Sequence, residues 1–435
     1  MRFLLIDDEG APCSLAYQLQ QRELHEVKMF SEKPEGREHL NGIVAQVQTI
    51  EQGLGWLGKS NYFIRGDELD CSELRQRGYK GYGGNLFTER IENDRQFEME
   101  IAQRAGIPIP NFHLLENIDE GIQFIKDNPD QYCLKQMGHA PKTWNYVGHF
   151  EDGTDVIDQL EWIRMQPEFE DMADCPFMLQ EFVEGIEFAV TAFWQYTDWL
   201  KDENGNVIMV VNKEHKKEGD GDTGRTCGEM GTVARFTIDQ TKLFAATLDK
   251  LTPILKENAP DVCVAIDANC GVIDTGECWL YELTTRTGYP ISALIEFLLA
   301  PNVGNFFIGL IEGNPWTGSW KKGWGVVTVL GSGQYPDEGD SHEGCFKDQP
   351  VRMEIDQNIQ PFFIRWDEDK NYYRIADYYE YVAGVTYVGD DIIETNQKCV
   401  EKMQEIDVRA PHYRHDIGTK FAEEEIPILA ELGYL

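Results

Sequence analysis

The sequence predicts a multidomain protein that combines α/β and α+β architecture, and three observations support this prediction. The chain has 435 residues, more than one ordinary domain holds, so roughly two to four packed units are expected. It begins with a short apolar strand at residues 3–6, a turn, and a helix from Ser14 to Arg22, the usual start of a doubly wound α/β domain. It ends, after Gly344, in an acidic and aromatic segment of α+β type.

The central elements follow from apolar runs and from the residues that interrupt them. A glycine-rich connector at residues 79–85 marks a boundary, and the helix at 92–105 after it ends at Gly106. Short apolar runs predict further strands at 132–135, 177–183, 262–268, 277–283 and 325–330. We therefore expect three domains, which cover residues 1–90, 91–315 and 316–435.

Composition and charge narrow the class of protein. Hydrophobic residues make up 42% of the chain and aromatic residues 11%, enough for a large core. The formal net charge of −37 argues against nucleic acid and anionic membrane surfaces as partners. Ten cysteines without a Cys-x-x-Cys pair or zinc-ligand spacing favour reduced thiols. Because no apolar run has membrane-spanning length and the apolar start is too short for a signal peptide, we expect a cytoplasmic protein.

The densest run of glycine and aspartate lies at residues 219–224, which read Gly-Asp-Gly-Asp-Thr-Gly. Glycine permits positive φ, and aspartate bonds to neighbouring amides, so this run predicts a tight loop with exposed N–H donors and carboxylates. A basic segment at 213–217 precedes it. Such a loop suits a phosphate, a metal-bound nucleotide or a polar substrate, although a solvated surface turn has the same composition.

Several features occur in an order that suits a nucleoside triphosphate. Lys135 ends a strand and can reach the α- and β-phosphates as a point charge. Backbone groups around residues 180–183 can receive adenine at a strand edge, and Glu187 follows where a carboxylate can accept the ribose hydroxyls. Each residue alone has an ordinary structural explanation, but their joint occurrence favours ATP.

The pair of strands at 262–268 and 277–283 carries acidic residues suited to a metal ion. Asp267 and Glu282 can hold Mg²⁺, with Mn²⁺ as the alternative, through carboxylate oxygens. Arg286 follows the second strand and can bind the γ-phosphate. The alternatives are a turn aspartate and a paired edge carboxylate.

Several motifs also resemble those of a known family. Residues 179–187, Leu-Gln-Glu-Phe-Val-Glu-Gly-Ile-Glu, resemble its adenine clamp and ribose-binding glutamate. Residues 215–224 resemble its His-Lys-Arg-x-Gly-Asp-Gly-Asp-Thr-Gly motif, and residues 95–97 its Lys-x-Phe helix. Residues 384–390 and 413–418 resemble its C-terminal segments. The sequence is similar to the ATP-grasp superfamily and, within it, to the glycinamide ribonucleotide synthetase (phosphoribosylamine–glycine ligase) family.

The resemblance implies an ATP-grasp fold preceded by a Rossmann-like domain and followed by a small α+β domain, with a mobile nucleotide-clamping subdomain over about residues 112–188. It implies ATP and Mg²⁺ as cofactors and a ligase that forms an amide through an acyl phosphate. The implied ATP-binding residues are Arg95, Lys135, Gln180, Glu181, Phe182, Val183, Glu187, Lys213, His215 and Lys216. The implied substrate-binding residues are Asp220, Asp222, Thr223, Gly224 and Gly288. The implied metal ligands are Asp267, Glu282 and Thr284, and the implied catalytic residues are Arg286 and Lys135.

The chain departs from the family where substrates are expected. Residues 8–13 form an acidic loop in place of a phosphate-binding Gly-Gly-Arg-Glu-His segment, and the lid at 140–145 is bulky rather than glycine-rich. The family's Arg-Phe-Gly-Asp-Pro-Glu is replaced by Arg-Thr-Gly-Tyr-Pro-Ile at 286–291, so that Tyr289 and Ile291 replace two carboxylates. Thr284 stands in place of a metal-binding asparagine.

These departures predict an ATP-dependent carboxylate–amine ligase with changed acid or amine specificity. One alternative is a genuine phosphoribosylamine–glycine ligase of purine biosynthesis. The other is a catalytically silent nucleotide-binding protein on the same fold. We expect small-molecule carboxylate and amine substrates, no nucleic acid, no membrane, and a monomer or homodimer.

Overall fold

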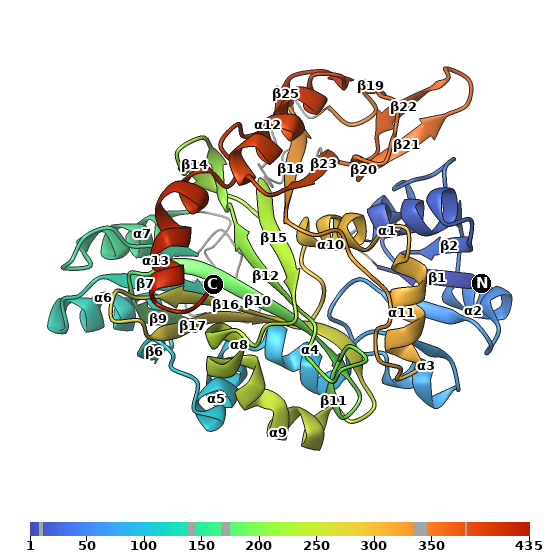
Figure 1. Cartoon of the computed structure of the whole chain (residues 1–435). Helices are drawn as coiled ribbons and strands as arrows, with labels where there is room; N and C mark the ends of the chain where they lie inside the picture. The colour runs from blue at the N-terminus through green and yellow to red at the C-terminus, as the bar shows by residue number, and fades with distance from the viewer. Residues whose placement is uncertain (8–11, 138–144, 167–174, 334–345, 379–380) are drawn as a thin grey trace. The chain divides into compact units, whose positions relative to one another are not determined.

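Figure 1 shows the computed structural model of the chain, which describes residues 1–7, 12–137, 145–166, 175–333, 346–378 and 381–435. The chain forms two compact units. Unit 1 comprises residues 1–89, 187–268 and 284–435, and unit 2 comprises residues 90–186 and 269–283. Both units are therefore assembled from segments that are distant in the sequence.

Unit 1 begins with a parallel five-stranded sheet, drawn in blue in Figure 1. Its strand order is β3-β2-β1-β4-β5, and all neighbours run parallel. An order that starts in the middle and winds outward in both directions is that of a doubly wound fold, which confirms the predicted Rossmann-like start. Phe3, Leu4 and Leu5 are fully buried, as expected for a strand covered on both faces. The strands are β1 (Arg2–Ile6), β2 (Glu26–Phe30), β3 (Ala45–Gln46), β4 (Tyr62–Arg65) and β5 (Lys80–Tyr82).

The first helix after β1 forms close to where the sequence predicts it. It starts as α1 (Cys13–Tyr17) and continues as a π-helical turn, η1 (Gln18–Arg22). Helix α2 (Ile50–Leu57) begins at Thr49, whose side chain accepts a hydrogen bond from the Gln52 backbone N–H, an ordinary N-cap. The remaining helix of this layer is α3 (Ser72–Gln76).

The second sheet of unit 1 runs in the order β16-β10-β12-β15-β18-β23-β20, and strands from β10 to β20 are antiparallel to their neighbours. The part of β16 in unit 1 is buried at every residue, yet it carries an aspartate. A buried carboxylate in such a strand needs compensating partners. The strands are β10 (Ile186–Gln195), β12 (Met209–Glu214), β15 (Gly231–Thr237), β16 (Cys263–Val272), β18 (Trp324–Ser332), β20 (Ile359–Pro361) and β23 (Tyr381–Gly389), with β11 (Asp198–Trp199) and β25 (Pro411–His412) at their sides.

Helices of unit 1 cover this sheet. Helix α10 packs against β15, β18, β23 and α1, and α12 packs against β18 and β23. These helices are α8 (Lys242–Ala246), α9 (Leu248–Asn258), α10 (Ile291–Leu299), α11 (Val303–Ile311), α12 (Ile392–Met403) and α13 (Ile426–Glu431), the last preceded by the π-helical turn η5 (Phe421–Glu425). In the described part of the chain, no single helix is long and apolar enough to cross a membrane; only α10 and α11 taken together pass by length and composition, with a bend of 101° between them.

Two small sheets complete unit 1. A hairpin joins β13 (Lys217–Gly219) to β14 (Thr223–Thr226) and holds the Gly-Asp-rich loop between its strands. A four-stranded antiparallel sheet near the C-terminus has the order β21-β22-β19-β24. Its strands are β19 (Pro350–Arg352), β21 (Ile364–Asp367), β22 (Tyr372–Ile375) and β24 (Asp407–Val408).

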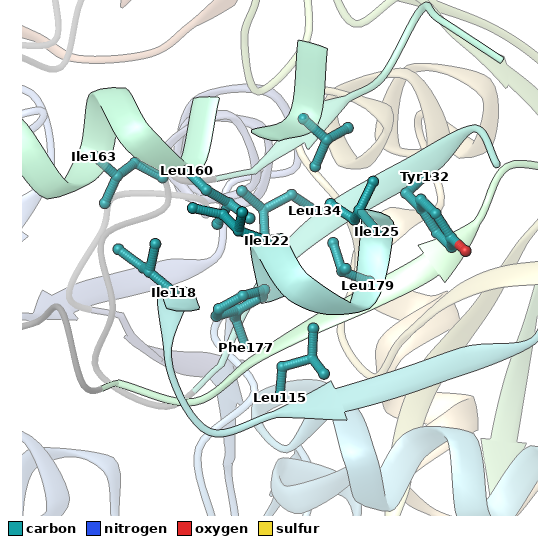
Figure 2. Packing of buried hydrophobic residues seen from close by; sticks show 11 residues of the cluster. Leu115, Ile118, Ile122, Ile125, Tyr132, Leu134, Leu160, Ile163, Phe177 and Leu179 are labelled. Atoms are coloured by element: carbon teal, nitrogen blue, oxygen red, sulfur yellow. The ribbon is translucent and has the colours of Figure 1, made fainter. Parts of the chain in front are cut away.

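Unit 2 is built on a four-stranded antiparallel sheet in the order β6-β9-β7-β8. Figure 2 shows the core between this sheet and two helices, with Ile118, Ile122 and Ile125 of α6 gathered near Phe177 and Leu179 of β9. Burying each such side chain contributes about 1.5–3 kcal/mol. The elements are α6 (Ile118–Asp127), α7 (Thr154–Met165), β6 (Phe112–Leu115), β7 (Tyr132–Gln136), β8 (Tyr146–Val147) and β9 (Phe177–Glu181).

A helix and a hairpin complete unit 2. Helix α5 (Arg95–Ala105) begins where the Asp94 side chain accepts from the Phe97 N–H and ends at Gly106, whose φ of 72° is left-handed, in agreement with the predicted end. The hairpin is formed by the end of β16 and by β17 (Cys278–Thr284). Helix α4 (Leu86–Asn93) leads from unit 1 into unit 2 along the chain.

Candidate active site

Asp267 lies at the centre of a buried polar network in unit 1. Its Oδ1 accepts hydrogen bonds from the Thr191 hydroxyl (2.6 Å) and the Asn212 amide (3.1 Å), which come from β10 and β12. The residue is only 8% exposed. Burial, and then the nearby carboxylate of Glu214, raise the pKa of Asp267 to about 7. The aspartate is therefore held in place by neutral donors that leave its charge uncompensated.

Further carboxylates surround Lys216 in the same unit. The Lys216 ammonium contacts Glu214 Oε2 (3.0 Å) and Glu187 Oε1 (3.1 Å). Burial, and then Glu214, raise the pKa of Glu229 well above its usual range. Burial and the charge of Glu214 therefore disfavour ionisation of Asp267 and Glu229, and Lys216 acts in the opposite direction.

The donor chemistry of this network suits a hard divalent cation. Mg²⁺ is usually held by one or two carboxylates, with waters and substrate phosphates completing its shell, rather than by an all-protein cage. Buried Asp267 and half-buried Glu214 supply carboxylate oxygens where a cation would relieve their mutual repulsion. Within the described residues, no three His, Cys, Asp or Glu side chains gather as a complete metal site, so Mg²⁺ here would depend on such outside ligands.

The segment after β17 places the predicted phosphate-binding arginine in unit 1. Arg286 Nε lies 3.5 Å from Glu68 Oε2. The hydroxyls of Thr287 and Tyr82 share a hydrogen bond of 2.8 Å. Thr284, at the end of β17, is half-buried, and the Gly288 carbonyl accepts from the Ser292 N–H (2.9 Å) at the start of α10.

The Gly-Asp-rich loop is tied down by the segment at 413–418, also in unit 1. Arg414 donates to Asp222 Oδ1 (2.8 Å) and to both oxygens of Asp416. The His415 backbone N–H donates to Asp220 Oδ1 (2.7 Å), and the imidazole contacts the other oxygen. Although burial opposes its ionisation, the hydrogen bonds from Arg414 lower the pKa of Asp416 to about 2. Both loop aspartates therefore have partners within the protein.

The backbone of this loop needs its glycines. Gly221 and Gly224 have φ values of 68° and 82°, a region that side chains with a Cβ rarely adopt. Asp222 also has a positive φ, 53°, which aspartate tolerates better than most residues. The Thr223 hydroxyl donates to the Asp220 carbonyl (2.8 Å) and closes the turn.

His215 and Lys213, predicted to contact ATP, make internal contacts in unit 1. The Gly418 N–H donates to His215 Nε2 (3.0 Å), so the ring proton lies on Nδ1 and bonds the Gly231 carbonyl (3.1 Å). Burial, followed by the charges of Arg414 and Lys213, lowers the pKa of His215 to about 4, and the ring is neutral. The Lys213 ammonium lies 3.0 Å from Glu425.

Unit 2 holds a second ion-pair network. Arg95 donates to Glu98 (2.8 Å) and to Glu282 (3.1 Å). Glu98 also accepts from the Leu283 N–H (2.5 Å). Burial raises the pKa of Glu98 to about 8, and Lys135 on β7 acts in the opposite direction. Arg95, Lys135 and Glu282, three of the predicted site residues, thus share one electrostatic network around Glu98.

The predicted adenine-binding stretch follows β9 in unit 2. Gln180 is buried and lies between its β6 and β7 partners. The Glu181 side chain accepts from Asn111 (2.7 Å), and the Phe182 N–H donates to the Gln131 carbonyl (2.8 Å). The Val183 carbonyl accepts from the Tyr281 hydroxyl (2.7 Å).

Sequence reasoning missed the residues that surround Asp267. Thr191 and Asn212 lie within apolar runs, and Glu214 lies inside a segment interpreted as basic. The only sequence signal for these residues is a polar side chain inside an otherwise apolar strand. That signal does not identify a site until the neighbouring strands are known. Residues 8–11 of the acidic loop and residues 140–144 of the lid, both considered in the sequence analysis, lie outside the described residues.

Known proteins resemble this chain in sequence. Residues 93–262 match the family described as phosphoribosylglycinamide synthetase, ATP-grasp (A) domain. The chloroplastic phosphoribosylamine–glycine ligase of Arabidopsis thaliana is 22% identical over 357 residues, which cover 80% of this chain and 64% of the plant protein. The enzyme of the same name from Synechocystis sp. is 24% identical over 384 residues, covering 83% of this chain and 84% of that protein.

Solved structures share the fold. Phosphoribosylamine–glycine ligase from Thermotoga maritima superimposes with a TM-score of 0.75 at 17% identity, covering 96% of this chain and all (100%) of that one. Biotin carboxylase from Campylobacter jejuni gives a TM-score of 0.63 at 12% identity, covering 99% of this chain and 97% of that one. The chain therefore carries a segment similar to an ATP-grasp domain and shares its fold with these solved structures. In sequence it is similar to phosphoribosylamine–glycine ligase, an ATP-grasp carbon–nitrogen ligase.

Proposed function

We propose that the protein is an ATP-dependent carboxylate–amine ligase that forms an amide through an acyl phosphate, with substrates other than phosphoribosylamine and glycine. The observation that carries the proposal is the network of Asp267, Glu214 and Lys216 in unit 1. It combines one buried and one half-buried carboxylate suited to Mg²⁺ with a lysine suited to phosphate. The family comparisons support the same chemistry.

The reaction needs positioning and charge neutralisation more than covalent help. A substrate carboxylate oxygen attacks the γ-phosphorus of ATP, the bond to the β-phosphate oxygen breaks, and ADP leaves. An amine nitrogen then attacks the acyl carbon, the bond to the phosphate oxygen breaks, and phosphate and a proton are released. Mg²⁺ would neutralise charge on the transferred phosphoryl group, and so would basic side chains.

Several of the predicted site residues keep their assigned roles in this proposal. Asp267, with Glu214 added to it, would hold Mg²⁺, and the assignments of Glu282 and Thr284 as further ligands stay predictions. Arg286 and Lys135 would contact phosphates. Glu187, which shares Lys216 with Glu214, would accept the ribose hydroxyls.

The changed substrate specificity rests on Tyr289. Where the family has an aspartate, the Tyr289 ring packs at 4.6 Å from Phe362 and 5.5 Å from Tyr381, measured between centroids. An aromatic cluster at this position offers no carboxylate to the ammonium group of glycine. The names of the relatives favour the second candidate, a genuine phosphoribosylamine–glycine ligase.

The test is release of ADP and phosphate from MgATP by the purified protein, with phosphoribosylamine plus glycine beside a matrix of other acids and amines. Turnover with another pair supports the proposal and names the substrates. Turnover with the purine pair alone replaces it with the second candidate. MgATP binding in a thermal-shift assay without turnover in any mixture would establish a silent nucleotide-binding protein.

A further inference from the structure

A small cavity of about 30 Å³ lies inside unit 1. Ile64, Arg65 and Gly66, at the carboxyl end of parallel strand β4, form one wall, and residues of α10 and α11 form the other. In doubly wound sheets this end of the strands is where ligands bind. The volume exceeds the 10–15 Å³ or so that a single water requires, and it suits one small polar group.

Two buried polar atoms on α10 line this cavity without a hydrogen-bond partner. They are Glu296 Oε2 and Ser292 Oγ, on residues that are 5% and 8% exposed. Their spacing of one helical turn places both side chains on the same helix face. Because native proteins seldom leave such atoms unsatisfied, the two point to a ligand that completes them.

The charge of the site identifies the kind of ligand. The Arg65 guanidinium in the wall is already bonded to Asp67, so Glu296 is the acidic group that faces the cavity without compensation there. Most of the remaining wall is apolar, including Leu15, Phe193 and Phe306. A carboxylate and a hydroxyl in an apolar pocket of this size suit an ammonium group and repel an anion.

We propose that Glu296 and Ser292 form a subsite for the ammonium group of a small primary amine, the amine substrate of the proposed ligase. This identification of the ligand as a substrate rests on the proposed function. Thr287, directly after Arg286, also lines the cavity, so the subsite adjoins the predicted phosphate-binding arginine along the chain. The carboxylate that Tyr289 and Ile291 no longer supply is thus provided by Glu296, further along α10.

The surroundings of Glu296 predict that binding of an ammonium group is accompanied by release of a proton. Burial raises its pKa to about 8, while the Ser14 hydroxyl and the charge of Arg22 act to lower it and Glu23 acts to raise it. At neutral pH the empty site is therefore mostly protonated. An arriving ammonium group favours the carboxylate form, so binding releases up to about one proton from the Glu296 carboxyl group to buffer.

The experiment is calorimetric titration of the full-length protein at pH 7 with methylammonium chloride, in two buffers of different ionisation enthalpy. Tetramethylammonium chloride and sodium chloride are the controls, because neither can donate a hydrogen bond. We expect saturable binding of methylammonium with proton release, and none for the controls. Glu296→Gln should weaken binding at least about tenfold and abolish proton release, as the loss of a hydrogen bond to a charged group implies.

Two further variants keep the result interpretable. Ser292→Ala should weaken methylammonium binding by a smaller factor, and Glu431→Gln, at an exposed position on α13, should leave it unchanged. Circular dichroism checks that each variant folds. Equal binding by wild type and Glu296→Gln, or no saturable binding at all, would overturn the subsite. Because the titration requires no ATP, a failure of the ligase proposal appears separately, as absence of turnover in a protein that still binds methylammonium.

Discussion

Two acidic regions of unit 1 use the same residue types in opposite ways. In the loop at 219–224, Asp222 pairs with Arg414, Asp220 accepts from the His415 N–H, and the pKa of the adjoining Asp416 falls to about 2. On β16 and α10, burial dominates, and the pKa values of Asp267 and Glu296 rise to about 7 and about 8. A carboxylate with an internal cation is a structural tie, whereas a buried carboxylate without one is suited to receive a cation from outside.

The largest effect is expected for Asp267→Asn, which tests whether this buried carboxylate binds a cation. The amide can still accept from Thr191 and Asn212, so the fold should survive while the charge is lost. We expect kcat for ATP turnover to fall roughly 10²–10³-fold, since a group that positions charge at a reacting phosphate contributes on this scale. Steady-state kinetics over a range of Mg²⁺ concentrations measure it, and an unchanged kcat would remove Asp267 from the metal site.

Substitutions at the contacts of the loop at 219–224 should lower the stability of the protein rather than its turnover of ATP. The Arg414 side chain is 2% exposed and joins Asp222 to Asp416. Arg414→Ala removes a buried guanidinium and leaves exposed Asp222 and partly buried Asp416 without their cation, and we expect the free energy of unfolding to fall by about 2 kcal/mol. Chemical denaturation measures this change. The matched control is Arg352→Ala, whose side chain is 72% exposed in its ion pair, with an expected loss below about 0.5 kcal/mol. Equal losses would contradict the structural role of the loop.

Because His215 is neutral in the folded protein, the stability of the region around the loop at 219–224 should depend on pH. Its folded pKa of about 4 lies below the usual 6.5, so the unfolded chain binds the extra proton and acidification favours unfolding. Between pH 7 and pH 5 this group alone should cost about 2 kcal/mol of stability.

The measurement is the unfolding free energy of wild type and His215→Gln at several pH values. Other titrating groups are common to both proteins, so the difference between the two curves reports His215. A wild-type curve that follows the variant throughout would show that the imidazole titrates normally.

The smallest expected change in stability is the difference between removing a buried hydroxyl that has a hydrogen-bond partner and removing one that has none. Ser292→Ala removes a hydroxyl without a partner from a helix, and we expect the unliganded protein to gain up to about 1 kcal/mol. Ser332→Ala removes a buried hydroxyl that donates to the Arg409 carbonyl (2.6 Å), with an expected loss of about 1 kcal/mol. Thermal unfolding compares the two, and destabilisation by Ser292→Ala would show that its hydroxyl has a partner.

Local sequence determines much of what surrounds these sites. The run of apolar residues at 3–6 predicts the central strand of the parallel sheet, because a strand covered on both faces has no polar side. Gly106 predicts the end of α5, because its left-handed backbone costs little only for glycine. The motif at 215–224 predicts a tight turn for the same local reason and indicates the family.

Tertiary structure alone decides which side chains meet. Arg414 reaches Asp222 across 192 residues, and Thr191 reaches Asp267 across 76. No periodicity within either segment encodes those contacts. The orientation of Ser292 and Glu296 follows from helical spacing, but the cavity they face is made by β4, β5 and α11. Hydrogen bonding and burial depend on neighbours in space. The sequence could therefore indicate which residue types carry charge, while only the fold could distinguish carboxylates held by an arginine from those whose hydrogen-bond donors are neutral.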